Sequence, residues 1–485
     1  MIVDCPVAAF AARAPGAPAL RFVSPGAPPV ILTAAELDAR VRTWQGWLRA
    51  EGLAPGERLA LSSHGSPDAL ALIYACAREG VVVALPSARL TPAELAPLWA
   101  RLRPRRVVAP PALLVHAPLG APLTMPAAPA VTGPARWDLS RPLAVFFTSG
   151  TEGPPKGALL TAGALLASAR AAVDLLGLEA GGAWLSALPL FHVGGLGAAL
   201  RCALAGAALW QHERFDAAAA ADDLASGATH ASLVAVTLAR ALDALGARPV
   251  TERLRAVMVG GGPVPAALLA RARAAHVPVV QTYGLTEAAS HVCCERPDDA
   301  DGATAGPAVP GTDVRIVSAD GAPLPPETAG IIEVRGASLF AGYLDDPDAT
   351  ARALRGGWLR TGDLGTLDAH GRLVVHTRRL DLIVTGGENV YPAEVEAALL
   401  THPAVAEAAV LGEADATWGQ RVVAVVALRA PASLDELVAH CRLRLAAFKV
   451  PRVLRVVESL PRTPVGKLDR RALREALGLA PLDVG

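Results

Sequence analysis

Short apolar runs and amphipathic stretches alternate along the first part of the chain. Positions 58–62 and 81–85 are continuous apolar runs typical of buried strands, and the stretch 67–78 between them has the spacing of a helix. Strand, helix and strand in this order predict a βαβ unit, which requires a parallel sheet.

A second series of the same kind begins near position 184. It contains expected strands at 184–186, 204–210, 230–236, 254–259 and 277–281, with expected helices at 217–224, 239–245 and 265–275. Two α/β layers of this kind predict two related subdomains with a cleft between them.

The pattern changes after Arg296, where prolines and glycines cluster. Short alternating strands at 314–317, 331–334 and 373–376 predict a smaller β-rich subdomain. A compact α+β pattern then follows, with expected helices at 393–400, 434–445 and 468–477 and expected strands at 405–411 and 422–428. The predicted fold class is therefore α/β, with a large N-terminal domain (1–380) and a small α+β C-terminal domain (381–485).

Composition narrows the class of protein. A chain of 485 residues is too long for one ordinary domain, and 45 Lys and Arg balance 45 Asp and Glu. This balance gives no reason to expect a nucleic acid or an anionic membrane as partner. The most apolar window, 191–210, contains His192, Arg201 and four glycines, so we expect a core helix and strand there, not a membrane span.

Cysteines and the first residues indicate a compartment. The six cysteines lack the paired spacing of a zinc site and are sparse for a disulfide framework, which favours a reducing cytoplasm. The first residues lack a basic segment, so we expect no signal peptide.

A polar, glycine-rich stretch follows the expected strand 143–147 and precedes the Ala- and Leu-rich stretch 158–178, which we expect to be a helix. Strand, loop and helix in this order let backbone N–H groups point at a phosphate. The candidate phosphate-binding residues are Thr148, Ser149, Gly150, Thr151, Gly153 and Lys156. The stretch is not the P-loop of NTPases, because Lys156 is followed by Gly157. A surface loop between two elements is the alternative that this stretch alone leaves open.

Positions 147–157 resemble the phosphate loop of the adenylate-forming superfamily, which includes acyl-CoA synthetases, luciferases and the adenylation domains of peptide synthetases. Its usual form is (S/T)-S-G-(S/T)-(T/E)-G-x-P-K-G. Further motifs of the superfamily follow in the same order, at 189–192, 260–262, 283–287, 358–363, 378–381, 385–392 and 461–467. Arg378 replaces a glycine of the family pattern, and Glu152 puts an acid where many members have a neutral hydroxyl.

The resemblance implies roles in the N-terminal domain. His192 would lie at the acyl pocket, and Gly261 and Gly262 would lie beside the adenine. Tyr283 would offer its ring to the adenine and Thr286 its hydroxyl to the α-phosphate. Glu287 and Thr151 would be the Mg²⁺ ligands, since Mg²⁺ is usually held by few protein oxygens plus substrate phosphates. From the residues alone, His192 could instead be a core histidine, and the other motifs could be a turn or a helix cap.

Towards the C-terminus the resemblance implies five further roles. Asp363 would bind the ribose, and Arg379 the ribose or a phosphate. Gly387 and Glu388 would line the pantetheine channel. Lys467 would reach the acyl carboxylate and the phosphate during adenylation, although a solvated lysine is the alternative. Asp381 would be the hinge of a mobile C-terminal domain, because 386–389 and Lys467 cannot easily face one site at once.

The implied activity joins a carboxylic acid to coenzyme A with ATP and Mg²⁺, through an acyl-adenylate. Positions 283–293 are similar to the o-succinylbenzoate–CoA ligases of menaquinone biosynthesis. That substrate is a dicarboxylate, and Ser290 and His291 lie where groups for its second carboxylate could be.

Several alternatives to this function stay open. The chain could be a ligase for another aryl or medium-chain acid, a carrier-protein adenylation domain or a non-catalytic nucleotide-binding module. We expect small-molecule partners, no nucleic acid, no integral membrane segment, a cytoplasmic location and a homodimer as one option.

Overall fold

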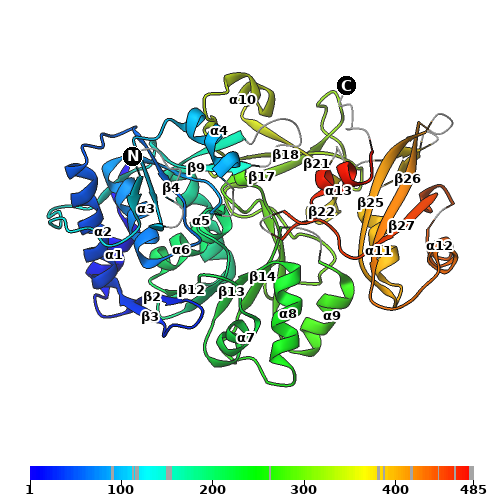
Figure 1. Cartoon of the computed structure of the whole chain (residues 1–485), viewed down its shortest axis with the longest axis horizontal. Coiled ribbons are helices and arrows are strands. Elements are labelled where there is room, and N and C mark those ends of the chain that lie inside the picture. Colours follow the sequence, from blue (N-terminus) through cyan, green and yellow to red (C-terminus); the bar gives the residue numbers. More distant parts are fainter. Residues whose placement is uncertain are drawn as a thin grey trace. The chain divides into compact units, whose positions relative to one another are not determined.

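A computed structural model describes residues 1–88, 92–111, 114, 120–148, 156–261, 264–378, 383–385, 388–390, 392–415, 419–445, 447–463 and 466–479. The chain forms two compact units (Figure 1). The first contains Met1–Val314 and Val334–Leu359, and the second contains Arg315–Glu333 and Arg360–Gly485. The domain division at 380/381 stays a prediction.

The first sheet of the first unit has seven strands within the described residues. In sheet order they are β19 (Gly342–Tyr343), β10 (Lys156–Thr161), β9 (Pro142–Thr148), β5 (Val82–Leu85), β4 (Arg58–Leu61), β6 (Arg106–Ala109) and β7 (Gly120–Pro122). Helix α3 (Pro67–Glu79) connects β4 to β5, which are parallel, so the expected βαβ unit is confirmed. Local signals bound this helix, because the Ser66 side chain caps its N-terminus and Gly80, with φ of 69°, ends it.

The stretch after the phosphate-loop motif differs from the prediction. Residues 156–161 form β10, which pairs antiparallel with β9 and also with β19. Helix α5 (Ala162–Leu176) begins only after Thr161, whose side chain accepts a hydrogen bond from the Ala164 N–H group. The expected strand–loop–helix order is therefore wrong, since β10 precedes the helix. Pairing on both sides of β10 outweighs the helix propensity of its Ala and Leu residues.

In the part of the chain that the structure describes, the second sheet of the first unit has eight strands. In sheet order they are β16 (Cys293–Cys294), β15 (Val279–Tyr283), β14 (Ala256–Val259), β13 (His230–Leu233), β11 (Ala183–Ser186), β12 (Ala208–His212), β2 (Pro18–Val23) and β3 (Val30–Thr33). The six strands from β15 to β2 are parallel, and only the two edges are antiparallel. The expected α/β layer is thus confirmed.

Alternation along these strands separates two faces of the sheet. Leu185, Ala231 and Val257 belong to a buried core with residues of α7 (Ala217–Ser226), α8 (Ala235–Leu245) and α9 (Ala266–Ala274), and Figure 1 shows these three helices gathered beside β13 and β14. Trp184 and Met258 have the opposite parity. Helix α6 (Val193–Ala205) carries Arg201, which contacts Trp184, so α6 lies over that other face.

Two of the expected strands lose residues to neighbouring helices. Helix α6 continues to Ala205, so only residues 208–212 of that segment form a strand, and α8 begins at Ala235. The apolar window 191–210 is therefore a helix followed by a strand, as expected. No helix in the described ranges is long and apolar enough to span a bilayer.

Further helices complete the first unit. They are α1 (Pro6–Arg13), α2 (Ala34–Ala50), α4 (Pro92–Leu102) and α10 (Pro347–Ala353). A small antiparallel pair of strands, β1 (Ile2–Asp4) and β8 (Arg136–Asp138), lies outside the two large sheets.

The β-rich and α+β predictions for the later part of the chain are also confirmed. One sheet contains β17 (Thr312–Val317), β18 (Gly330–Gly336), β20 (Leu354–Arg355), β21 (Trp358–Leu367) and β22 (Leu373–Arg378). The last sheet contains β23 (Ile383–Thr385), β24 (Glu388–Val390), β25 (Val405–Asp415), β26 (Gly419–Leu428) and β27 (Val453–Val457). Three helices accompany the last sheet: α11 (Pro392–Leu400), α12 (Leu434–Arg442) and α13 (Arg470–Ala476). Strand β27 was not expected.

Candidate active site

The segment from Tyr283 to His291 is a tight loop at the carboxyl end of β15. Only glycine fits at position 284, because the Cβ atom of any other residue would lie 1.5 Å from the Ser290 carbonyl oxygen. A 3-10 turn spans Thr286–Ala288, and Ser290 has a φ of 103°, which is strained for a residue with a side chain. Strained backbone of this kind clusters at functional sites, and the loop carries four of the predicted site residues.

Glu287 and Lys156 both contact Tyr343, a residue that no sequence motif identified. The Tyr343 hydroxyl donates a hydrogen bond of 2.9 Å to the Glu287 carboxylate, and the Lys156 Nζ atom lies 5.3 Å from the centre of the Tyr343 ring. Burial, and then the charge of Glu287, raise the pKa of Tyr343, so this hydroxyl stays protonated and remains a donor. In the sequence, Tyr343 is preceded by a glycine but belongs to no recognised motif. Its partners Glu287 and Lys156 are distant along the chain, so no local pattern indicates the contact.

The oxygen donors at this place fit Mg²⁺ better than a transition metal. No group of three or more His, Cys, Asp or Glu side chains that could hold a metal occurs within the described ranges. One carboxylate with the phosphates of a bound nucleotide is the set that Mg²⁺ usually takes. Glu287 fits the predicted role, while Thr151 lies outside the described residues.

His192 occupies the turn that leads into α6. It is the N-cap residue of this helix and its ring lies 5.3 Å from that of Phe191. Gly195 allows the turn to pack closely, since a Cβ atom there would lie 2.3 Å from the Pro189 carbonyl oxygen. The expected motif 189–192 is thus held against the start of α6.

Arg201 lies on the same helix, nine residues after His192, and is fully buried. Its Nη2 atom lies 3.1 and 3.2 Å from the two ring nitrogens of His291, and its Cζ atom lies 4.8 Å from the centre of the Trp184 ring. Among the described residues, no carboxylate pairs with Arg201, and its Nε and Nη1 atoms have no hydrogen-bond partner.

The guanidinium of Arg201 is therefore a buried charge that an anion would stabilise. Burial lowers its pKa to about 10, which still leaves it charged at neutral pH. In the sequence, Arg201 stands out only as a charge in the most apolar window. That unusual position was the available signal for a functional role.

Polar side chains line the carboxyl ends of three neighbouring parallel strands next to Trp184. Ser186, Gln211 and Ser232 are register partners on β11, β12 and β13. The Oγ atom of Ser186 and the Oε1 atom of Gln211 are buried without a hydrogen-bond partner in the part of the chain that the structure describes. Ligands of α/β proteins bind at this end of the strands, so these atoms are available to one.

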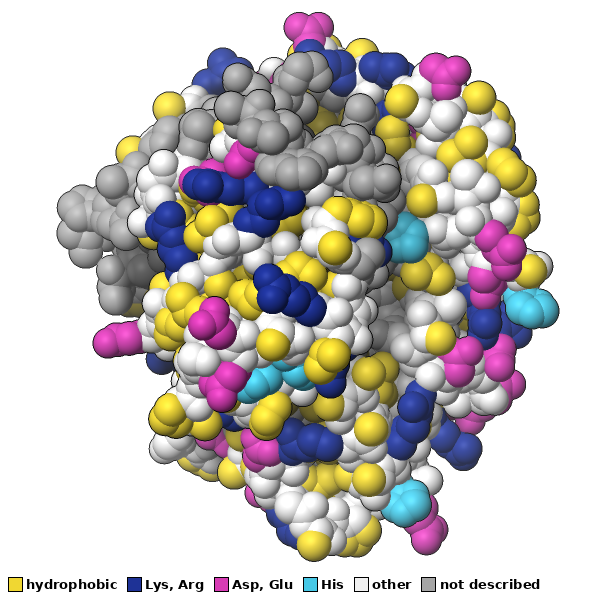
Figure 2. Space-filling model, turned by 90° about the vertical axis from the view of Figure 1, so that its right-hand side faces the viewer, with side chains coloured by type: hydrophobic (Ala, Val, Ile, Leu, Met, Phe, Trp, Pro, Cys, Tyr) yellow, Lys and Arg dark blue, Asp and Glu magenta, His cyan; other side chains and the backbone are white. Residues whose placement is uncertain are grey.

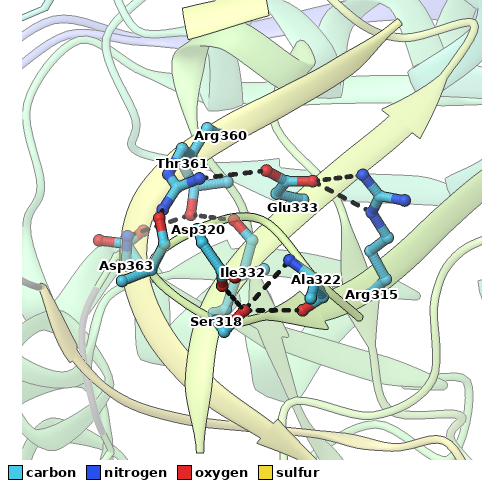
Figure 3. A network of polar contacts seen from close by, with 10 residues as sticks. Arg315, Ser318, Asp320, Ala322, Ile332, Glu333, Arg360, Thr361 and Asp363 are labelled. Atoms are coloured by element: carbon cyan, nitrogen blue, oxygen red, sulfur yellow. Dashed lines mark hydrogen bonds and ion pairs between the residues drawn. The ribbon is translucent and has the colours of Figure 1, made fainter. Parts of the chain in front are cut away.

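In the second unit, Asp363 lies within β21, two residues after Thr361, whose side chain is held by hydrogen bonds (Figure 3). The Thr361 hydroxyl donates to the Ile332 carbonyl oxygen at 2.9 Å and accepts the Asp363 N–H group at 3.1 Å. Arg360 is oriented by the Ala319 carbonyl oxygen and lies 3.8 Å from the Glu333 carboxylate. Asp363 is therefore buried, and its backbone is held by the hydrogen bond to Thr361, which is consistent with the predicted role in ribose binding.

Some of the other predicted site residues are described, and the rest lie outside the described ranges. Lys467 is exposed in the second unit, and Gly261 has a φ of 85°. Thr148 ends β9 and Glu388 begins β24, but their side chains are not described. Outside the described residues lie Ser149, Gly150, Thr151, Gly153, Gly262, Arg379, Asp381 and Gly387.

Comparison with known families and proteins agrees with this geometry. The family model of AMP-binding enzymes matches residues 7–344, and that of the AMP-binding enzyme C-terminal domain matches residues 394–467. A 2-succinylbenzoate–CoA ligase of Geobacillus kaustophilus is 39% identical over 92% of this chain and 93% of its own. A 2-succinylbenzoate–CoA ligase of Bacillus cereus is 36% identical over the same shares.

Solved structures of one enzyme are also similar. The o-succinylbenzoate CoA synthetase of Bacillus subtilis in complex with the acyl-adenylate intermediate superposes with a TM-score of 0.91 at 32% identity, over 98% of each chain. Its complex with ATP and a magnesium ion gives 0.91 at 31% identity, over 98% of this chain and 100% of that one.

Proposed function

Because the chain belongs to the family of AMP-binding enzymes, we propose that it is an AMP-forming ligase that joins o-succinylbenzoate to coenzyme A at the expense of ATP. It would thereby serve menaquinone biosynthesis. Relatives with this name match over nearly the full length of both chains, which supports the proposal.

The reaction has two steps. A carboxylate oxygen of the acid attacks the α-phosphorus of ATP, and the bond to the β-phosphate breaks to release pyrophosphate. The thiol of coenzyme A then attacks the acyl carbon, a thioester forms and AMP leaves. Neither step needs a covalent nucleophile from the protein, so the chain contributes positioning and charge.

The residues of the first unit divide these tasks. Glu287 would hold Mg²⁺, which would supply positive charge for the phosphate oxygens of ATP. The Tyr343 hydroxyl orients the Glu287 carboxylate, and the Tyr343 ring supports the Lys156 ammonium. Lys156 supplies a positive charge beside the triphosphate.

The observation that carries the choice of acid is the buried charge of Arg201. One carboxylate of o-succinylbenzoate reacts, and the other would enter a buried position only with a cation beside it. Arg201 provides this cation, with two nitrogen atoms that lack partners within the described ranges. Ser290, expected from the sequence to contact the substrate, precedes the Arg201 contact His291 in the same strained loop.

The first experiment measures pyrophosphate release with ATP and a panel of acids: o-succinylbenzoate, benzoate and a medium-chain fatty acid. We expect release with o-succinylbenzoate and conversion of the adenylate by free coenzyme A. Preference for another acid would change the substrate, and preference for a pantetheinylated carrier would indicate an adenylation domain. No release with any acid would indicate a non-catalytic module.

Arg201→Gln should raise the KM for o-succinylbenzoate by about 10- to 100-fold, since hydrogen bonds to a charged group contribute about 1.5–3 kcal/mol. The KM for ATP should stay unchanged. ATP–pyrophosphate exchange at varied acid concentration measures both, with Arg170→Gln, an exposed arginine of α5, as the matched control. An equal rise of the KM for benzoate would contradict the assignment.

The remaining roles are proposals that rest on the motifs. Asp363 would bind the ribose, Lys467 would act in adenylation and Asp381 would be the hinge of the C-terminal domain. Gly387 and Glu388 would contact the pantetheine arm.

Location and partners are proposals as well. The six cysteines are free and buried, which supports a reducing compartment such as the cytoplasm. On the face shown in Figure 2, basic and acidic side chains are interspersed with apolar ones, which fits small-molecule partners and no nucleic acid. Formation of a homodimer stays a prediction.

A further inference from the structure

Arg201 is one layer of a column of four buried side chains. The rings of His230 and Trp184 are stacked, with centroids 5.1 Å apart and an interplanar angle of 12°. The Arg201 Cζ atom lies over the Trp184 ring, 4.8 Å from its centre, and the Nη2 atom contacts both ring nitrogens of His291. The guanidinium therefore contacts two rings, one from β11 and one from the loop after β15.

Each ring of the column is fixed by its own hydrogen bond. Trp184 donates from Nε1 to the Ser232 hydroxyl at 2.9 Å, and His230 donates from Nε2 to the Leu176 carbonyl oxygen at 2.9 Å. His291 Nε2 lies 2.9 Å from the Met258 sulfur atom. These bonds leave the rings little freedom, so they define where the guanidinium can lie.

The two histidines do not compete with Arg201 for an anion. Burial lowers the pKa of His230, and burial together with the charge of Arg201 lowers the pKa of His291 well below its usual range. Both imidazoles are therefore neutral, and Arg201 carries the one positive charge of the column. A cation over an indole face keeps its charge at a defined place without a carboxylate partner.

Helix α6 leaves room for this arrangement. Gly197 lies one turn before Arg201, and a Cβ atom at this position would lie 3.1 Å from the Nη2 atom. The side chain of Arg201 therefore folds back over a glycine of its own helix. A helix, a strand and a loop together determine the position of one guanidinium.

We propose that Trp184 and His291 are positioning residues that hold the Arg201 guanidinium for the second carboxylate of the acid, and so set the selectivity for dicarboxylates. This inference rests on the proposed function. An arginine has several rotatable bonds, and a displacement of about 1 Å can cost about 100-fold in rate. Arg201 alone would bind an anion, whereas the clamped Arg201 selects one with a carboxylate at the matching distance.

The test uses the selectivity ratio, which is kcat/KM for o-succinylbenzoate divided by kcat/KM for a monocarboxylate. Two analogues that each lack one carboxylate are assayed, and the one that still forms an adenylate is the comparator. We expect Trp184→Leu to lower this ratio by roughly 10- to 100-fold. Trp184→Phe keeps a ring under the guanidinium and should retain most of the ratio.

Matched variants separate positioning from folding. Trp47→Leu, on α2 outside the column, should leave the ratio unchanged. In an Arg201→Gln background, Trp184→Leu should have no further effect on the ratio, because the clamped group is gone. If Trp184→Leu does not fold, His291→Asn removes the other ring that contacts the guanidinium, and the same loss is expected.

Two results would overturn the inference. Equal losses for both acids in Trp184→Leu and His291→Asn would make these residues merely structural. An unchanged ratio in the folded variants would show that Arg201 needs no clamp. A wild-type protein without preference for the dicarboxylate would instead refute the proposed function, so the two failures are distinguishable.

Discussion

Replacing Lys467 with alanine is expected to slow formation of the acyl-adenylate by about 10²–10³-fold, because one preorganised charge at the transition state is lost. Thioester formation from preformed acyl-adenylate should proceed at nearly the wild-type rate. The α-phosphorus is attacked only in the first step, so a lysine that stabilises the transition state of that attack should not affect the second step.

The local structure indicates that this variant will fold. The Thr463 N–H group donates to the Lys467 carbonyl oxygen at 2.7 Å, and the Gly466 N–H group donates to the Thr463 carbonyl oxygen at 2.8 Å. Both bonds involve backbone atoms and survive the change to alanine. The Lys467 side chain is exposed, so its loss leaves no cavity.

Separate assays of the two half-reactions check this prediction. ATP–pyrophosphate exchange reports adenylation, and consumption of supplied acyl-adenylate with coenzyme A reports the second step. Lys449→Ala is the matched control, since the chain contains three lysines and Lys449 is the other one in the second unit. Equal losses in both half-reactions would show that Lys467 has a structural role.

Glu287→Gln is expected to lower ATP use at limiting Mg²⁺ by at least about 100-fold, because even indirect partners of a metal ligand typically contribute 10- to 100-fold. The amide keeps the size of the side chain and still accepts the hydrogen bond from Tyr343, but it lacks the charge that Mg²⁺ requires. The KM for the acid should stay unchanged.

Tyr343→Phe tests the orientation of the Glu287 carboxylate without changing its charge. It keeps the ring beneath Lys156 and removes only the hydroxyl that orients Glu287, so a smaller loss of about 10-fold is expected. Titration of Mg²⁺ at fixed ATP gives the half-saturating concentration for each variant. If this concentration is the same in Glu287→Gln as in the wild type, Glu287 does not bind the metal.

Local signals in the sequence predicted much of the fold. The βαβ unit around α3 followed from hydrophobic period and from the caps Ser66 and Gly80, since both act over a few residues. The loop from Tyr283 to Glu287 was found for the same reason, because its glycine and its acid lie within five positions. The sequence therefore determined those elements and sites whose chemistry is local.

The tertiary structure decided what depends on distant partners. Residues 158–160 have helix-forming side chains, yet they form a strand, because β9 and β19 supply hydrogen bonds on both sides. Tyr343 lies 56 positions from Glu287, and Arg201 lies 90 positions from His291. Neither pair has a sequence pattern, since strand order and helix packing bring its members together. The tyrosine that contacts Glu287 and the buried arginine became recognisable only through these long-range contacts.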